Sequence, residues 1–267
     1  MLLRCMEKLT KRIRHWLFSS RKDDFFWRPQ WSAYLLEHVA FYRWLNDEDR
    51  QRFERRCFAF LRTTRIEASG AVDISDDDRL LVAASSVIPV WGFPNWPYLS
   101  VKAVVLFPGL FNRDFECGQP DSTIAGMVGS GPMAGKMALS KPELHYGFRN
   151  SHDKKNVGVH EFAHILDMVD GRCDGDPKIT ESGRCSQQWF AFIQHKIGQI
   201  EKRKSNIDAY GATNAQEFFA VSSEYFFERP LMLKQKHPAL YEYLSDFYRQ
   251  NLADIEREQR SFNRKRG

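Results

Sequence analysis

The segment His160-Glu161-Phe162-Ala163-His164 decides how the rest of this chain is interpreted. On an α-helix, residues four apart share a face, so His160 and His164 can direct ring nitrogens at one metal ion. Glu161 lies about 100° further round the helix. This offset keeps its carboxylate off the metal but near a metal-bound water, for which it can act as general base. The segment therefore predicts a catalytic zinc site that activates water for attack on a carbonyl group.

The residues around the motif have the periodicity of a buried helix. Apolar side chains recur about every 3.6 residues, and Gly171 follows as the expected end of the helix. The alternative interpretation is that both histidines are ordinary helix residues and Glu161 is a surface charge, which this context disfavours. The apolar positions are Val157, Phe162, Ile165, Leu166 and Val169.

A third metal ligand has to come from another segment. Catalytic zinc usually has three protein ligands and one open position. The metzincin pattern would place glycine and histidine where this chain has Asp167 and Asp170. We therefore expect a carboxylate ligand from a second helix further along the chain.

The helix predicted after Asn214 carries two carboxylates at a useful spacing. Thr213 or Asn214 can cap it, and Pro230 ends it. Glu217 and Glu224 are seven residues apart, so two helical turns give them nearly the same direction. One can bind the metal while the other holds a ligating histidine. From the residues alone, a capping-box role for Glu217 and a solvated charge at Glu224 stay open.

These segments resemble a known family. The motif at 160–164, followed by Tyr210 and by Glu217-Phe218-Phe219-Ala220, is similar to the active site of the Mlc titration factor A family of zinc metallopeptidases. It also resembles the catalytic domain of anthrax lethal factor. The similarity to the titration factor family includes the segments that begin at Gly70 and Val104, so it covers about residues 45–250.

The resemblance implies a role for individual residues. It makes Glu217 the third ligand of one Zn²⁺ beside His160 and His164, and places Tyr210 next to the metal, where it can stabilise the developing oxyanion. Without the resemblance, a tyrosine beside Gly211 is more typical of a half-buried anchor. The implied fold is α+β and zincin-like, of the gluzincin type: mostly helical, with a small mixed sheet beside the motif helix.

The implied activity is aminopeptidase-like hydrolysis of peptides in the cytoplasm, with Glu161 as general base and Tyr210 as a second catalytic residue. The family is also named for binding and sequestering a glucose-responsive transcriptional repressor, so such a protein is an expected partner. The alternative is a regulatory repressor-binding protein with little or no physiological proteolysis. The sequence does not rank these two roles.

Composition agrees with a cytoplasmic enzyme. The 267 residues are 43% apolar, and a net charge of +5 is too small to favour direct nucleic-acid binding. Five cysteines without a Cys-x-x-Cys pair predict reduced thiols. No apolar run is long enough for a secretory signal or a membrane span.

The chain is expected to form one metallopeptidase domain, residues 31–252, with a helical lead-in. Residues 1–30 form a basic amphipathic segment that docks on the domain or frays, with weak membrane binding as the alternative. Residues 253–267 are expected to be a charged mobile tail. Within the domain, we expect a strand at 136–140 to be a sheet edge that pairs with substrate, and glycine-rich loops at 109–135. Helices are predicted at 31–45, 47–61, 79–86, 187–203 and 239–251, and another strand at 101–107.

Overall fold

The computed structural model describes residues 27–70, 72–94, 98, 100–129, 133–170, 173–176 and 186–264. Most of the amphipathic segment predicted at 1–30 lies outside these residues, as do Cys5, Gly171 and Cys185. Among the described residues, no helix is both long and apolar enough to cross a membrane.

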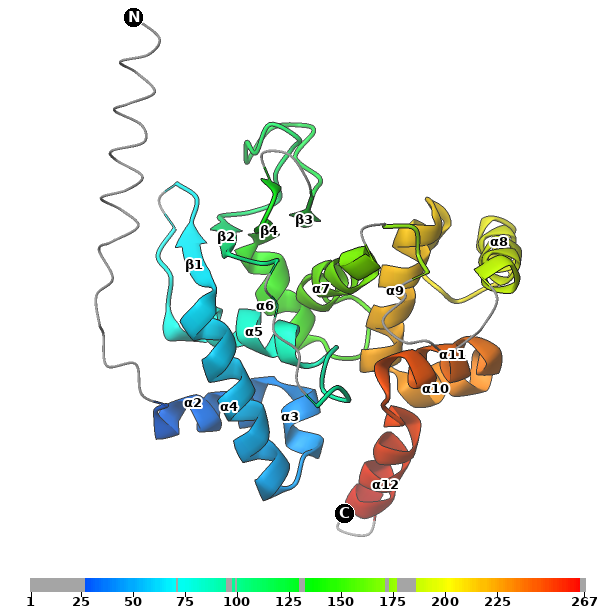
Figure 1. Cartoon of the computed structure of the whole chain (residues 1–267), viewed down its shortest axis with the longest axis horizontal. Helices are drawn as coiled ribbons and strands as arrows, with labels where there is room; N and C mark the ends of the chain where they lie inside the picture. Colours follow the sequence, from blue (N-terminus) through cyan, green and yellow to red (C-terminus); the bar gives the residue numbers. More distant parts are fainter. Residues whose placement is uncertain are drawn as a thin grey trace, which may run out of the picture.

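Helices make up most of the described chain (Figure 1). In chain order, the elements are α2 (Pro29–His38), α3 (Ala40–Trp44), α4 (Asp47–Thr63), β1 (Arg65–Ala68), α5 (Asp76–Val87), β2 (Ala103–Phe107), β3 (Gly126–Val128), β4 (Lys136–Ser140), α6 (Lys141–Arg149), α7 (Val157–Asp167), the 3₁₀ turn η2 (Met168–Asp170), α8 (Ser186–Glu201), the 3₁₀ turn η3 (Ala209–Ala212), α9 (Ala215–Glu228), α10 (Pro230–Lys236), α11 (Pro238–Tyr248) and α12 (Leu252–Arg264).

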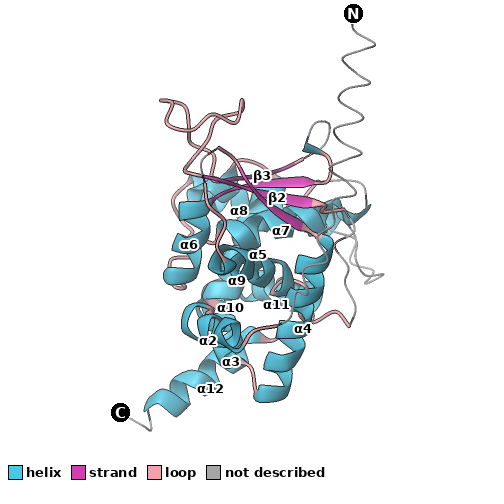
Figure 2. Cartoon of the chain, turned by 90° about the vertical axis from the view of Figure 1, so that its left-hand side faces the viewer, coloured by secondary structure: helices cyan, strands magenta, loops and turns pink. Residues whose placement is uncertain are grey.

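The strands form one small mixed sheet in the order β1-β2-β4-β3. β1, β2 and β4 are parallel, and β3 pairs antiparallel with β4. The sheet lies at one end of the molecule, over a layer of helices that includes α5 and α7 (Figure 2). Its other face carries a smaller apolar cluster around Phe107 and Phe111. This arrangement confirms the predicted α+β class, mostly helical with a small mixed sheet.

The position of β4 corrects one prediction. The strand occupies Lys136–Ser140 as expected, but it lies between β2 and β3 and is not a sheet edge. β3, which was predicted as part of the glycine-rich loops, forms the edge instead. A strand of three residues that begins with glycine is too short to give a recognisable alternation.

Two further predictions change, one of a helix and one of a mobile tail. The helix expected at 31–45 is interrupted at Val39, which has an extended backbone (φ −109°, ψ 101°) and is fully buried, so α2 and α3 are separate. The tail expected to be mobile from residue 253 is helical up to Arg264. Leu252 and Ala253 are buried there, and the Glu256 carboxylate accepts the Leu231 N–H at 2.9 Å. The prediction failed because most residues of this tail are charged, whereas the few apolar ones pack it against the rest of the protein.

Candidate metal centre

Helix α7 brings the motif residues into the interior. Asn156 caps the helix by accepting the Val159 N–H at 3.1 Å, which fixes where the first turn begins. His160, Glu161 and His164 are all buried. The helix ends at Asp167 and continues as the turn η2, before the predicted end at Gly171.

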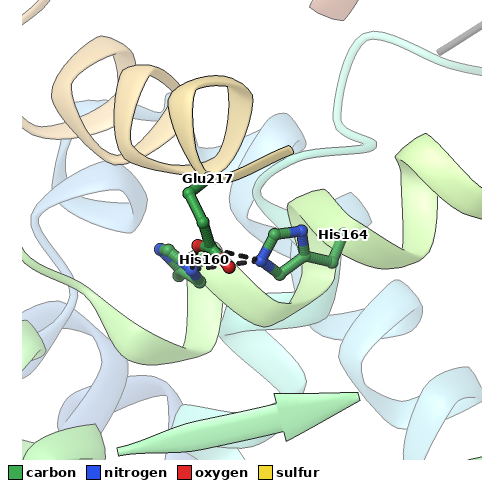
Figure 3. A group of neighbouring side chains, drawn as sticks. All are labelled: His160, His164 and Glu217. Atoms are coloured by element: carbon green, nitrogen blue, oxygen red, sulfur yellow. Dashed lines mark hydrogen bonds and ion pairs between the residues drawn. The ribbon is translucent and has the colours of Figure 1, made fainter. Parts of the chain in front are cut away.

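Helix α9 lies beside α7 and supplies a carboxylate to the same point (Figure 1). Asn214 caps α9 by accepting the Glu217 backbone N–H at 2.9 Å. The Glu217 side chain is not used for capping, because it points at the two histidines (Figure 3). Asn214 therefore caps the helix, while the side chain of Glu217 is left free to bind a metal.

The distances among the three donor atoms fit a tetrahedral zinc site. His160 Nε2 lies 3.2 Å from His164 Nε2 and 3.1 Å from Glu217 Oε2, and His164 Nε2 lies 3.5 Å from Glu217 Oε2. Ligands about 2.0–2.1 Å from a tetrahedral ion lie roughly 3.3 Å from each other. Among the described residues, these three form the one group of histidine, cysteine and acidic side chains close enough to share a metal ion.

The protonation of Glu217 agrees with ligation. Burial by itself raises the pKa of its carboxyl group. Hydrogen bonds from His160 and His164 outweigh that effect and lower the pKa to about 2. The group is therefore ionised at neutral pH, which is the form that binds a metal.

Glu224 contacts the ring nitrogen of His160 that faces away from the other two donor groups. Its Oε1 lies 2.7 Å from His160 Nδ1, and its Oε2 accepts the backbone N–H of Asn156. Because the carboxylate accepts, Nδ1 carries a proton, so Nε2 is the nitrogen left to bind a metal when the ring is neutral. Glu224 is only 7% exposed, so the solvated-charge interpretation was wrong.

Glu161 lies beneath the edge strand. It is 4% exposed, and burial raises the pKa of its carboxyl group although the two nearby imidazoles act in the opposite direction. Gly126 of β3 covers it so closely that a Cβ atom at that position would lie 2.5 Å from Glu161 Oε1. The sequence did not predict that residue 126 has to be glycine, because no sequence pattern indicates where a side chain would clash with a distant residue.

Tyr210 stands at the rim of the site on η3. It is 53% exposed, more than a half-buried anchor, and its ring centroid lies 6.1 Å from that of His160. The part of the side chain that is buried raises the pKa of the phenol, and the carboxylates of Glu217 and Glu161 raise this pKa further. Tyr210 therefore keeps its proton at neutral pH and can donate a hydrogen bond.

A cleft of about 490 Å³ opens beside these groups. Its walls come from the start of β3, from α6, from the loop before α7 and from α9, and they include His160, Glu161 and Tyr210. His145 of α6 does not line this cleft and contacts the buried Asp78 at 2.7 Å.

Comparisons with known proteins identify the family of this chain. The model of a family described as glucose-regulated metallo-peptidase M90 matches residues 12–249. The chain belongs to this family. M90 membership confirms the resemblance found in the sequence and implies a metal ion, which the three donor groups of α7 and α9 fit.

Two relatives match over most of their length. The chain is 31% identical to the uncharacterized protein slr2042 of Synechocystis over 88% of this chain and 89% of the relative. It is 27% identical to the Mlc titration factor A of Yersinia enterocolitica over 91% and 93%. A Mlc titration factor A from Yersinia pestis is 38% identical over a shorter stretch, 38% of this chain and 40% of that protein.

Proposed function

We propose that this M90 metallopeptidase is a zinc-dependent peptidase of the gluzincin type, in which His160, His164 and Glu217 hold the metal. The observation that carries the proposal is the set of three distances between 3.1 and 3.5 Å among their donor atoms. Bound zinc would polarise the scissile carbonyl and activate water. Two neutral imidazoles and one carboxylate are the donors expected of a catalytic zinc site in this class.

The residues around the donors have distinct tasks. Glu161 accepts a proton from the attacking water, and its raised pKa brings it nearer to the working pH. Tyr210 donates a hydrogen bond to the oxygen on which negative charge develops. Glu224 fixes the tautomer and orientation of His160.

The edge strand β3 offers a place for an extended peptide. Ser140 N–H donates to Ala125 O at 2.7 Å, so in the antiparallel pair the groups of Ala125 and Met127 face β4. The backbone groups of Gly126 and Val128 then point to the free edge. A peptide added at this edge would run alongside Gly126, the residue that covers Glu161, and this transfers the predicted strand pairing from β4 to β3.

The proposed specificity is aminopeptidase-like, as the family resemblance implies. The test is turnover of a panel of peptides with free and blocked amino termini, before and after removal of metal with a chelator. We expect turnover that is lost on chelation and regained with one equivalent of Zn²⁺, and faster for free amino termini. Turnover that survives metal removal would contradict the zinc proposal, and equal rates on both peptide sets would contradict the aminopeptidase specificity.

A second function is binding of a transcriptional repressor. It is favoured by the similarity to proteins named Mlc titration factor A, one of which matches over 91% of this chain. We propose that such a repressor binds away from the zinc cleft, in the cytoplasm, where the reduced cysteines predicted for this chain persist.

The two functions can be separated with one variant. Glu161→Gln should abolish hydrolysis while repressor binding, measured by biolayer interferometry with a purified Mlc-type repressor, keeps its Kd. Loss of binding in this variant would show that the repressor contacts the cleft.

A further inference from the structure

Two side chains of α6 line the catalytic cleft without a role in the proposed zinc site. Glu143 and Tyr146 are three residues apart, which places them on one face of the helix. Both line the same cleft as His160 and Glu161. The position of α6 is fixed relative to the edge strand, because Ser140, the residue before α6, donates its N–H to Ala125 O.

The charge of Glu143 is not compensated within the cleft. Among the residues that the structure describes, its half-buried carboxylate forms no hydrogen bond or ion pair. The two lysines that line the same cleft have partners other than Glu143. Lys154 Nζ donates to Asn206 O at 2.5 Å, and Lys155 Nζ lies 3.5 Å from Asp208 Oδ2. Besides the proposed base Glu161, the cleft thus has a second carboxylate that is available to a ligand.

Tyr146 adds an aromatic face next to this carboxylate. It is 43% exposed, and its hydroxyl accepts a hydrogen bond from Asn150 Nδ2 at 3.2 Å, which helps to fix the ring. A carboxylate beside an exposed aromatic ring suits a cation, because the first supplies a charge-assisted hydrogen bond and the second a cation–π contact.

We propose that Glu143 and Tyr146 form a subsite for a positively charged group of the bound peptide. This inference rests on the proposed peptidase function for the identity of the ligand. An ammonium or guanidinium group fits, and it can come from a basic side chain or from the free α-amino group of the peptide.

The direction of the peptide decides between these two sources. Antiparallel pairing, which is slightly more stable than parallel pairing, places the C-terminal part of the peptide beside the start of β3. The cleft and Glu143 lie on that side, next to Thr123, Ile124 and Ala125. This geometry favours a basic side chain on the C-terminal side of the scissile bond. A peptide in the opposite direction would present its α-amino group instead.

The test measures binding, so that it does not depend on turnover. Four labelled peptides are titrated by fluorescence anisotropy into zinc-loaded Glu161→Gln protein. Three of the peptides have a blocked amino terminus and carry a neutral residue, a lysine or a glutamate directly after the scissile bond. The fourth carries the neutral residue and has a free amino terminus. The same peptides are titrated into proteins that also carry Glu143→Gln, Glu143→Lys, Tyr146→Leu or, as a matched control at an exposed residue of α11, Glu242→Gln.

The proposal predicts that the lysine peptide binds about fivefold to tenfold tighter than the neutral one. Glu143→Gln should remove this preference, Glu143→Lys should transfer it to the glutamate peptide, Tyr146→Leu should weaken it, and Glu242→Gln should retain it. If the free amino terminus gives the Glu143-dependent gain instead, the subsite stands and the peptide runs in the opposite direction. Ratios that are the same in all proteins would overturn the subsite. Binding of none of the four peptides would overturn it together with the peptidase function, whereas equal binding of all four would overturn the subsite alone.

Discussion

Replacement of Glu224 by glutamine should weaken zinc binding without disrupting the fold. The carboxylate accepts two hydrogen bonds, one from His160 Nδ1 at 2.7 Å and one from the Asn156 backbone N–H. Glutamine has a single carbonyl oxygen, and its amide nitrogen is a donor. One of the two N–H groups therefore loses its partner, and His160 is no longer held in the ligating tautomer by a charge.

The expected size follows from the hydrogen bond that is lost. A hydrogen bond to a charged group contributes about 1.5–3 kcal/mol, which corresponds to a factor of roughly 10–150 in affinity. Mutation of a carboxylate that orients a metal-bound histidine typically lowers metal affinity about 10–100-fold. We therefore expect the Kd for zinc to rise by between one and two orders of magnitude.

The assay is a competitive titration of zinc against a chelating indicator. Glu228→Gln is the matched control, since Glu228 is a buried glutamate one turn further along α9 whose Oε2 accepts the backbone N–H groups of Lys154 and Lys155. This control should keep the zinc Kd. A Kd for Glu224→Gln within twofold of the unmodified protein, with an unchanged circular dichroism spectrum, would refute the role of Glu224.

Two further changes probe the edge strand and the buried charge. Gly126→Ala should reduce peptide turnover by at least about a hundredfold at unchanged zinc content, because the new Cβ would lie 2.5 Å from Glu161 Oε1. The control is Gly129→Ala, whose Cβ would meet only Met133 Cβ at 3.7 Å. Equal turnover by the two variants would argue against this placement of Glu161. The pKa of Glu228 is raised to about 9 by burial and by neighbouring carboxylates, whereas an unfolded glutamate has a pKa of about 4.3, so this group's contribution to stability is lost as pH rises between these values. Glu228→Gln should therefore gain Tm relative to the unmodified protein progressively as pH rises from 5 to 9, and a Tm difference that does not change with pH would contradict the raised pKa.

The motif helix could be predicted from the sequence because its information is local. The four-residue spacing of His160 and His164 and the offset of Glu161 follow from helix geometry alone. The assignment of Glu217 as a ligand needed more information, because no local pattern shows which of the many carboxylates binds the metal held by another helix. Its seven-residue spacing from Glu224 reduced the choice, and the family resemblance supplied the assignment.

Other features depend on contacts between distant segments, and the sequence does not record them. β3 has only three residues, and Gly126 matters because it lacks a side chain above Glu161. The break at Val39 and the docking of α12 are set by burial against helices far away in sequence. In each case tertiary packing overrides a local preference or acts where no preference exists.

The most direct test of the account is peptide turnover by Glu161→Gln beside the unmodified protein at matched zinc content. The side chain is nearly isosteric and lies off the three donor atoms, so zinc should be retained while the general base is lost. We expect the unmodified protein to turn over peptides and the variant to be slower by a factor of at least about a hundred. Equal turnover by both zinc-loaded proteins would contradict the assignment of this site as the hydrolytic centre.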